Sequence, residues 1–519
     1  SGKAVDVYGA QKGNDTEIAD AEMAYTQTEL NGTDTFVRLP HDEWPRAWKD
    51  AGFIDPVCPL ILDLYGHPDA ATFWQDHCDK QLRAQGFKVV LDWPSCYFHD
   101  RLKCLLIVYV DDFKLAGPEE NLEKGWALLR TKLTIGPEGP LGMYLGCNQQ
   151  RESMTLYDGG TANVVIYDMT SFLAQCIERY LQVAPAGTKM KPASTPFLHD
   201  EGDLGPSRNP TTEHGEACPW CNYVTPTMTP QSAVSQVGGD SGTPANAAAD
   251  TGGTLEDDDR GQLADSASSV LMKILYAARM VRFDLLRAVQ GLAKHFTKWK
   301  KRHDQELYRL VCYIWTTKDK KMIGWVGDEI CDIHLHLFSD SDFAGSEGTQ
   351  RSTSGVHLCL RGPRTSFALS GQSKRQGCVS QSTTEAELVA GALALKSAGV
   401  PVIIITEILK AAATRNGPAA TVLHFHIDNQ AMAAVIRSGR NPTMRHLSRT
   451  HGISISWLHE TCRDDDIQMG YITTTLMAAD IYTKVSQDAV KWNIFCEQIN
   501  LIEPTALEGP GIHALHAVA

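Results

Sequence analysis

The alternation of apolar and polar residues predicts short strands separated by helices. Residues 19–180 combine short apolar runs with helical patterns, as an α+β domain would. Further along, Ile333, Leu335 and Leu337 alternate with polar neighbours, which is the period of a half-buried strand. Residues 356–360 and 421–427 also have strand character, so a second mixed domain is expected there.

Helices and a linker separate these strand regions. Apolar residues at helical spacing predict helices at about 270–317, 384–397 and 404–413. Residues 199–268 are instead rich in Gly, Pro, Ser, Thr, Asn and Asp, which is typical of a solvated linker. The pattern predicts a first domain at 1–198, an acidic flexible linker at 199–268, a helical connection at 269–330, a second domain at 331–490 and a C-terminal tail at 491–519.

Charge and cysteine content narrow the class of protein. The 519 residues carry a net charge of −14, but the linker holds 12 acids against 2 arginines, so the folded parts are close to neutral and can still bind phosphates. The 14 cysteines have no repeating spacing, which favours reduced thiols in an intracellular protein. No signal peptide or bilayer-spanning apolar run is recognised, so no membrane partner is expected. The missing initiator Met suggests a fragment or a processed product.

A first pair of acids ends a buried apolar run. Residues 105–110 are apolar and lead into Asp111 and Asp112, followed by Phe113 and Leu115. This pattern predicts a β-hairpin with carboxylates at its tip. Adjacent buried acids repel each other, and a divalent cation would remove that cost. On the dipeptide alone, an ordinary solvated turn is the favoured interpretation.

A second set of acids lies in the later domain. The strand around residue 335 ends in Asp340 and Asp342, and period-two alternation places both on one side. A helix opens near Thr384, with Glu387 at capping-box spacing. Two more acids, Asp428 and Asp480, follow a strand and begin a helix. Each alone is compatible with an ordinary cap or turn residue.

The strings around the first pair resemble the reverse transcriptase of copia-type retrotransposon polyproteins. They are DAEMAY at 20–25, LYGHP at 64–68 with Trp74, YVDD at 109–112, YLG at 144–146 and PASTP at 192–196. The resemblance implies a palm and thumb, a metal-binding triad of Asp20, Asp111 and Asp112, and nucleic-acid contacts by Gly66 and Tyr109. The family's fingers precede its first motif, whereas fewer than twenty residues precede Asp20, so an incomplete polymerase is expected.

The second set resembles the ribonuclease H domain of the same elements. The matching strings are FSDSDFAG at 338–345, RSTSG at 351–355, SQSTTEAEL at 380–388, DNQ at 428–430 and ADIYTK at 479–484. By resemblance, Asp340, Glu387, Asp428 and Asp480 would be catalytic and would bind two Mg²⁺ (or Mn²⁺) ions. One ion would activate water and the other would stabilise the departing 3′ oxygen of RNA. The implied fold is a mixed sheet flanked by helices.

The resemblance implies RNA-directed DNA synthesis and hydrolysis of RNA in RNA–DNA hybrids, with two ions in each active site. The implied partners are an RNA template, DNA, the hybrid and deoxynucleoside triphosphates. Two alternatives stay open. In one, only the ribonuclease H half is active. In the other, the chain is an inert remnant that at most binds nucleic acid.

Three minor features have both a functional and an ordinary explanation. Lys298, Lys300, Lys301 and Arg302 belong to a basic stretch that could follow hybrid phosphates or simply be a solvated helix face. His214, Cys218 and Cys221 offer three of the four ligands that a zinc site needs. His446 and His451 could assist proton transfer or product release, but surface histidines are the commoner case. Glu385 and Asp342 are nearby acids without an assigned role.

Overall fold

The computed structural model describes residues 2–156, 159–198, 215–217, 224–226, 259–345, 349–413 and 421–503. It is a mixed α and β structure with several separate sheets, as expected from the sequence. The chain divides into two compact units. One holds the residues up to Leu145 together with residues 404–413, and the other holds the remaining described residues.

The first unit is built on an antiparallel sheet in the order β4-β5-β6-β7-β1-β8. Trp74, Trp126 and Leu106 are part of its apolar core, and β6 is buried along nearly its whole length because its residues are apolar on both faces. The strands are β1 (Asn14–Asp20), β4 (Lys88–Val89), β5 (Cys96–His99), β6 (Cys104–Tyr109), β7 (Asp112–Pro118) and β8 (Gly139–Pro140). The short β9 (Met143–Tyr144) belongs to this unit but not to this sheet. The helices are α1 (Gly2–Gly9), α3 (Ala70–Ala84) and α4 (Glu119–Arg130).

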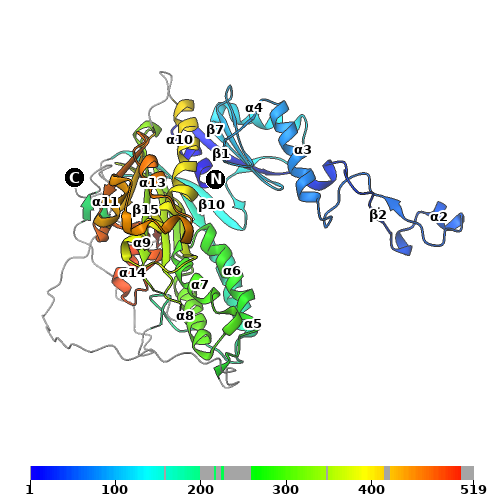
Figure 1. Cartoon of the computed structure of the whole chain (residues 1–519). Helices are drawn as coiled ribbons and strands as arrows, with labels where there is room; N and C mark the ends of the chain where they lie inside the picture. The colour runs from blue at the N-terminus through cyan, green and yellow to red at the C-terminus, as the bar shows by residue number, and fades with distance from the viewer. Residues whose placement is uncertain are drawn as a thin grey trace, which may run out of the picture. The chain divides into compact units, whose positions relative to one another are not determined.

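A small excursion interrupts this unit between β1 and α3. The pair β2 (Phe36–Val37) and β3 (Cys58–Pro59) extends away from the sheet together with α2 (Arg46–Asp50) (Figure 1). Two 3₁₀ helices, η1 (Ala24–Gln27) and η2 (His41–Glu43), complete this part.

The second unit is built on a mixed sheet, in which the strands follow the order β19-β18-β15-β16-β17-β14-β11-β10 and β20 also pairs with β14. β15 runs parallel to β18 and β18 runs parallel to β19, whereas β15, β16 and β17 are antiparallel. The strands are β10 (Cys147–Thr155), β11 (Thr161–Asp168), β14 (Lys321–Val326), β15 (His334–Asp342), β16 (Thr353–Gly362), β17 (Thr365–Arg375), β18 (Leu423–Ile427), β19 (Ile467–Tyr471) and β20 (Leu501–Ile502). A separate ribbon pairs β12 (Gly215–Ala217) with β13 (Val224–Pro226).

Helices α5 to α8 gather into one group beside this sheet, in the green part of the chain (Figure 1). They are α5 (Thr170–Val183), α6 (Ala267–Met280), α7 (Leu286–Ala293) and α8 (Lys301–Thr317), with η4 (Phe283–Leu285) and η5 (Phe296–Lys298) between them. The later helical elements are η6 (Ile330–Asp332), α9 (Thr383–Ala394), η7 (Leu395–Gly399), α10 (Val400–Ala413), α11 (Gln430–Ser438), η8 (Pro442–Met444), α12 (Leu447–Thr450), α13 (Ile455–Thr461), η9 (Thr474–Leu476), η10 (Ala478–Tyr482) and α14 (Ala489–Gln498).

One continuous helical run corrects an expectation about membranes. Thr383–Ala413 is long and apolar enough to cross a bilayer by length and composition alone, whereas no such run was expected. In its most apolar window 61% of the residues are buried inside the protein, and its first turns pack against β15 and β16. A core helix of a folded domain passes the same test, so this run is weak evidence for a membrane segment.

Several borders expected from the sequence differ in the structure. Residues 146–198 pack with the second unit because β11 forms backbone hydrogen bonds with β14. The expected C-terminal tail begins with α14 and β20, which are largely buried. Most of the expected linker lies outside the described residues. Within its described end, the Gln262 amide donates to Asp304 at 2.7 Å. The described cysteines are all free thiols, as expected.

A buried histidine cluster lies on the two strands that lead to Asp340 and Asp428. His336 on β15 is directly opposite His424 on β18, and Nδ1 of His336 lies 2.8 Å from Nε2 of His426. His336 and His426 are fully buried. Burial, together with the neighbouring charge of Arg361 and the other imidazoles, holds the pKa of both rings well below the ordinary value of 6.5. Burial also lowers the pKa of His424 to about 4, with a smaller contribution from His334.

Because these histidines are buried and neutral, we predict that the folded protein is less stable in mild acid. The unfolded imidazoles take up protons below pH 6.5 while the buried ones cannot, so the free energy of unfolding should fall between pH 7.5 and 5.5 by on the order of 1 kcal/mol per histidine. In His336→Phe we expect this pH-dependent difference to shrink by about that amount, as measured by urea unfolding followed by circular dichroism. The exposed His41, changed to Asn, is the control. An unchanged difference in His336→Phe would contradict the assignment.

Candidate metal centres

The first group of acids lies at the end of the β6–β7 hairpin. Tyr109 pairs with Asp112, so Val110 and Asp111 form the turn. Val110 has a φ of 58°, a left-handed conformation that is strained for a β-branched residue. The indole Nε1 of Trp74 donates a 2.6 Å hydrogen bond to the Val110 carbonyl and helps to hold this turn.

The β1–β7 register brings the three predicted acids to the same end of the sheet. Asp20 is directly opposite Asp112, and the amide of Ala21 donates to the carbonyl of Asp111 at 2.7 Å. Burial, the charges of Asp111 and Asp20, and a hydrogen bond to Asp20 raise the pKa of Asp112 to about 6. The site therefore resists full ionisation, which a bound cation would relieve.

The two residues predicted to contact nucleic acid near this group are accessible. Tyr109 is 59% exposed, and Gly66 sits in a turn with a φ of 96°, where a side chain would be strained. Tyr65, beside Gly66, is also exposed and lies edge-on to Tyr25, with ring centroids 4.6 Å apart. Burial and the nearby charge of Asp111 raise the pKa of Tyr25.

The second group of acids is tighter. Carboxylate oxygens of Asp340, Glu387 and Asp428 lie within 4.8 Å of one another. In the part of the chain that the structure describes, this is the one group of three or more acids, histidines or cysteines that meets this distance, so Asp20, Asp111 and Asp112 do not. Asp340 and Glu387 are buried, at 3% and 4% exposure. Carboxylates at this spacing fit a small divalent cation, which prefers oxygen ligands.

Three different elements supply these acids. Asp340 is near the end of β15, and Asp428 follows the parallel strand β18, so both emerge at the same edge of the sheet. Glu387 is in the first turns of α9, which packs on β15. The N-cap is two residues earlier than predicted from Thr384: Ser382 is the N-cap, and its hydroxyl accepts from the amide of Glu385. Glu387 is therefore free of a capping role and can reach the other two acids.

Hydroxyl groups orient the buried carboxylates. The Ser341 hydroxyl donates to Glu387 Oε1 at 2.8 Å, the Thr474 hydroxyl donates to Asp428 at 3.3 Å, and the Thr483 hydroxyl donates to Asp340. These bonds do not offset the crowding of negative charge. Burial and the charge of Asp340 raise the pKa of Glu387 to about 9. The same two causes raise the pKa of Asp428.

Asp480 lies beside this group in η10, a short 3₁₀ helix at the place where a C-terminal helix was expected to begin. One of its oxygens contacts the ammonium of Lys484, while the buried Oδ1 has no hydrogen-bond partner among the described residues. Burial and the charge of Asp340 raise the pKa of Asp480 to about 7. A buried carboxylate oxygen without a partner is costly. A cation shared with Asp340 would supply that partner, so the four residues fit the expected metal.

Asp342 does not join the metal group, although it shares a strand face with Asp340. Its carboxylate accepts from the amide of Thr353 and lies 3.2 Å from the guanidinium of Arg287. Arg287 also donates from Nε to the carbonyl of Thr483 at 2.9 Å. Asp342 therefore ties α7 to the strand that carries Asp340.

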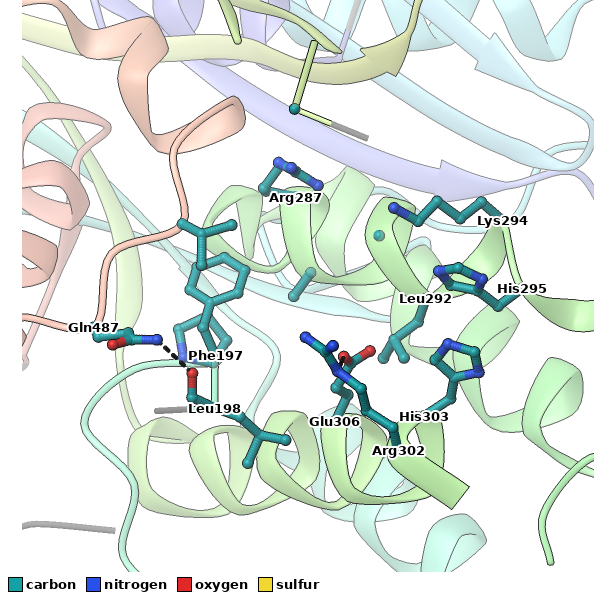
Figure 2. Close-up of a pocket in the computed structure, with 15 residues that line it drawn as sticks. Phe197, Leu198, Arg287, Leu292, Lys294, His295, Arg302, His303, Glu306 and Gln487 are labelled. Carbon is teal, nitrogen blue, oxygen red and sulfur yellow. Dashed lines mark hydrogen bonds and ion pairs between the residues drawn. The ribbon is translucent and has the colours of Figure 1, made fainter. Parts of the chain in front are cut away.

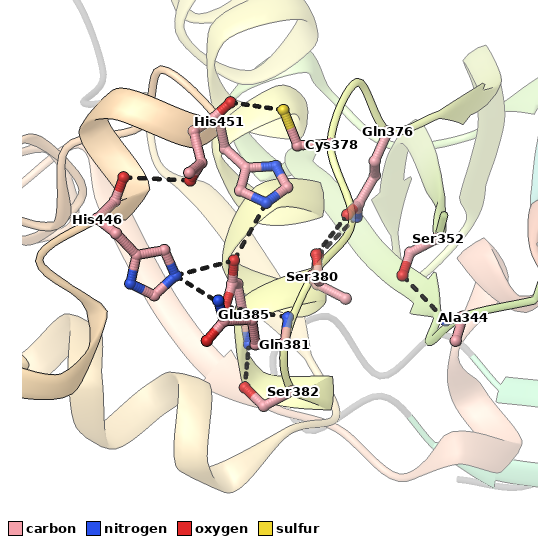
Figure 3. A network of polar contacts seen from close by, with 12 residues as sticks. Ala344, Ser352, Gln376, Cys378, Ser380, Gln381, Ser382, Glu385, His446 and His451 are labelled. Carbon is pink, nitrogen blue, oxygen red and sulfur yellow. Dashed lines mark hydrogen bonds and ion pairs between the residues drawn. The ribbon is translucent and has the colours of Figure 1, made fainter. Parts of the chain in front are cut away.

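Glu385 is not part of the close carboxylate group and instead contacts two histidines (Figure 3). His446 Nε2 lies 3.3 Å from both of its oxygens, and His451 Nε2 lies 3.1 Å from one of them. The amide of Gln381 donates to the other oxygen at 3.2 Å. The expectation of a plain surface histidine is wrong for His451, whose side chain is 2% exposed, because it packs against a buried acid.

The predicted basic stretch is only partly available for nucleic acid. Lys300 pairs with Asp259 at 2.7 Å, and Arg302 pairs with Glu306 at 3.0 Å. Lys298 and Lys301 are exposed. The possible zinc ligands His214, Cys218 and Cys221 lie outside the described residues.

Sequence reasoning missed the groups that support the acids. Thr483 and Lys484 stand within the string that contains Asp480, so their nearness to it could have been noticed. Ser341 lies between the two acids of β15, and its alternating position pointed away from the metal group. Arg287 carries no local signal, because its contact with Asp342 depends on how α7 packs.

Comparison with known proteins supplies the family relationship. No protein-family model matches the chain. It is 24% identical over 453 residues, 85% of its length, to the retrovirus-related Pol polyprotein from transposon TNT 1-94 of Nicotiana tabacum. It is 25% identical over 236 residues, 44% of its length, to the Ty1-JR2 and Ty1-ER2 Gag-Pol polyproteins of Saccharomyces cerevisiae.

These relatives are much longer than the chain, which spans 28% of the tobacco polyprotein and 12% of the yeast ones. The tobacco match extends over both compact units. The chain is therefore a homologue of retrotransposon Pol polyproteins, and the copia-type resemblance of its motifs is consistent with these relatives.

Proposed function

We propose that the second unit is a ribonuclease H-like nuclease that hydrolyses the RNA strand of RNA–DNA hybrids. The observation that carries this proposal is the meeting of Asp340, Glu387 and Asp428 within 4.8 Å at one sheet edge. The sheet order is β19-β18-β15-β16-β17. Along the chain, the antiparallel strands β15, β16 and β17 come first, and β18 and β19, which run parallel to β15, come after them. This arrangement supports the ribonuclease H-like assignment made from the motifs. The homology to Pol polyproteins supports a nucleic-acid substrate.

In this proposal, the acids bind the metal ions and the neighbouring side chains orient the acids. Asp340, Glu387, Asp428 and Asp480 would hold two Mg²⁺ or Mn²⁺ ions, which when bound activate water and stabilise the leaving 3′ oxygen. Ser341 and Thr483 fix the orientation of Glu387 and Asp340. The Lys484 ammonium offsets part of the negative charge through its contact with Asp480. Preorganised carboxylates reduce the reorganisation needed when the phosphodiester arrives.

A second proposal concerns the first unit. Asp20 stands directly opposite Asp112 beside the Asp111 turn, which supports a reverse-transcriptase palm for RNA-directed DNA synthesis from deoxynucleoside triphosphates. Their carboxylates are not gathered as closely as those of the second unit. Two rivals therefore stay open: a chain in which only the nuclease half is active, and an inert remnant that binds nucleic acid.

Hybrid cleavage tests the main proposal. With Mg²⁺, the purified chain should cut the RNA of an RNA–DNA hybrid, and Asp428→Asn should reduce the rate by roughly 100-fold or more, because a metal ligand is lost. The matched control is Asp465→Asn, which changes an exposed acid. Cleavage that persists in EDTA, or that is equal in Asp428→Asn, would overturn the proposal.

Primer extension on the same preparations separates the rivals. Extension that disappears in Asp112→Asn would support an active first unit. Cleavage without extension would leave the nuclease half as the active part. If the chain binds the hybrid but shows neither extension nor cleavage, it is the inert remnant.

Thermal unfolding tests the metal site independently of activity. Glu387 has a folded pKa raised above its unfolded value, so the folded chain binds more protons and loses stability as pH rises from about 4.5 towards 9. Without metal at pH 8, Glu387→Gln should therefore raise Tm by a few degrees, since about 1 kcal/mol corresponds to roughly 2–4 °C for a domain of 150–250 residues.

With added Mg²⁺, the Glu387 carboxylate should stabilise the folded chain instead of destabilising it. The ion should raise Tm of the unmodified chain, more at pH 8 than at pH 6, because binding must displace protons at the lower pH. This Mg²⁺ effect should be reduced in Glu387→Gln and retained in Asp465→Asn. An identical Mg²⁺ shift in all three chains would show that the ion binds elsewhere.

A further inference from the structure

We propose that a cationic cavity on the second unit, separate from the carboxylate group, binds a backbone phosphate of the nucleic-acid strand that the chain acts on. The cavity measures about 360 Å³ and lies between α7, the start of α8, and the segments around Phe197 and Gln487 (Figure 2). This inference rests on the proposed nuclease function and adds a binding site to it.

Positive groups dominate the cavity wall. Its lining includes the guanidinium-bearing Arg287 and Arg302, the ammonium of Lys294 and two histidines, against the single acid Glu306. Arg302 Nε is 3.0 Å from that acid, and the two side chains lie next to each other in Figure 2. Arg302 pairs with Glu306 and Arg287 pairs with Asp342, so the charge of Lys294 leaves the cavity net positive, which suits an anion.

Lys294 is the strongest indication of a ligand. It is half-buried at the cavity wall, and its ammonium makes no hydrogen bond or ion pair with any residue that the structure describes. Burial and the charge of Arg287 lower its pKa. A cation held in such a place is destabilised unless an anion joins it, and a phosphate oxygen would supply the missing partner.

The two histidines are arranged to donate hydrogen bonds. The rings of His295 and His303 stack with centroids 4.0 Å apart. The Lys300 amide donates to Nδ1 of His303 at 2.9 Å, so the neutral ring carries its proton on Nε2. Burial, followed by the neighbouring positive charges, lowers the pKa of His295 to about 4. An anion in the cavity would accept from these rings and favour their protonation.

The position of the cavity points to a strand rather than to free phosphate. Arg287, in its wall, bonds to the Thr483 carbonyl and to Asp342. Thr483 in turn bonds to Asp340 of the metal group. Gly345 and Val485, which follow these acids in the chain, also line the cavity. A polynucleotide presents phosphates at regular intervals, so one can occupy the cavity while another approaches the carboxylates.

Binding measured without cleavage tests this inference. The full chain is titrated with a labelled RNA–DNA hybrid in Ca²⁺, and anisotropy is recorded across a range of salt concentrations. Lys294→Gln should weaken binding roughly tenfold and lower the slope of log K against log[salt] by about 1, as expected for one lost phosphate contact. Its Tm should be unchanged or higher, because an unpartnered buried charge is removed.

Lys189→Gln is the matched control, since it removes the same charge from an exposed position of the same unit outside the cavity. It should change binding much less than Lys294→Gln. If both variants weaken hybrid binding equally, the hybrid binds a diffuse basic surface, and the proposed phosphate site in the cavity is overturned. Inorganic phosphate is the competing probe. Acylation of Lys294 is measured in the presence of each probe. If inorganic phosphate protects Lys294 from acylation and the hybrid does not, the strand proposal is overturned.

Asp428→Asn separates this inference from the nuclease proposal. It should bind the hybrid in Ca²⁺ with the same dependence on Lys294 while losing cleavage. If the unmodified chain binds through Lys294 but never cleaves, the nuclease proposal fails and the phosphate site stands. If it cleaves normally and Lys294→Gln binds as tightly as the unmodified chain, the phosphate site fails alone.

Discussion

Repulsion between buried carboxylates is the constraint around which the second unit is organised. Asp340, Glu387 and Asp428 meet within 4.8 Å, and Asp480 joins them with a buried oxygen that lacks a partner among the described residues. Like charges in a water-poor site cannot all ionise without a counter-charge. Burial, together with the charge of Asp340, raises the pKa of Glu387 to about 9. Such a site is unstable unless the surrounding fold forces the acids together, and a divalent cation reverses the sign of the interaction.

The fold supplies that force through rigid elements rather than loops. Asp340 and Asp428 are placed by neighbouring parallel strands, whose register is fixed by backbone hydrogen bonds. Glu387 is placed by a helix whose start is set by the Ser382 cap. The buried histidines of β15 and β18 remain neutral, so they supply no counter-charge to the acids. The packing energy of the whole sheet and α9 therefore opposes the repulsion at its edge.

The sequence revealed the elements and the acids better than it revealed their borders and supports. Alternation around Leu335 and the apolar run before Asp111 identified strands, because local periodicity reflects burial on each face. The predicted N-cap of α9, Thr384, is two residues beyond the observed cap, Ser382, because both residues satisfy the same spacing rule. The union of residues 146–198 with the second unit could not be foreseen, because strand pairing between β11 and β14 joins segments separated by the linker. For the same reason, Arg287 gave no sign of its contact with Asp342.

A chain with a net charge of −14 and a dense acidic group faces a second electrostatic difficulty with nucleic acid, since phosphates are repelled by the same carboxylates that hold the cations. Bound ions neutralise only the phosphate at the acids. The cationic cavity around Lys294 offers a complementary field, and it is connected to the acids through Arg287 and Thr483. Because the cationic cavity and the carboxylate group lie on connected elements, attraction of one phosphate to the cavity can offset repulsion of the next phosphate by the carboxylates. Charge separation over a short stretch of one unit, rather than overall charge, then decides whether this protein can hold a polynucleotide.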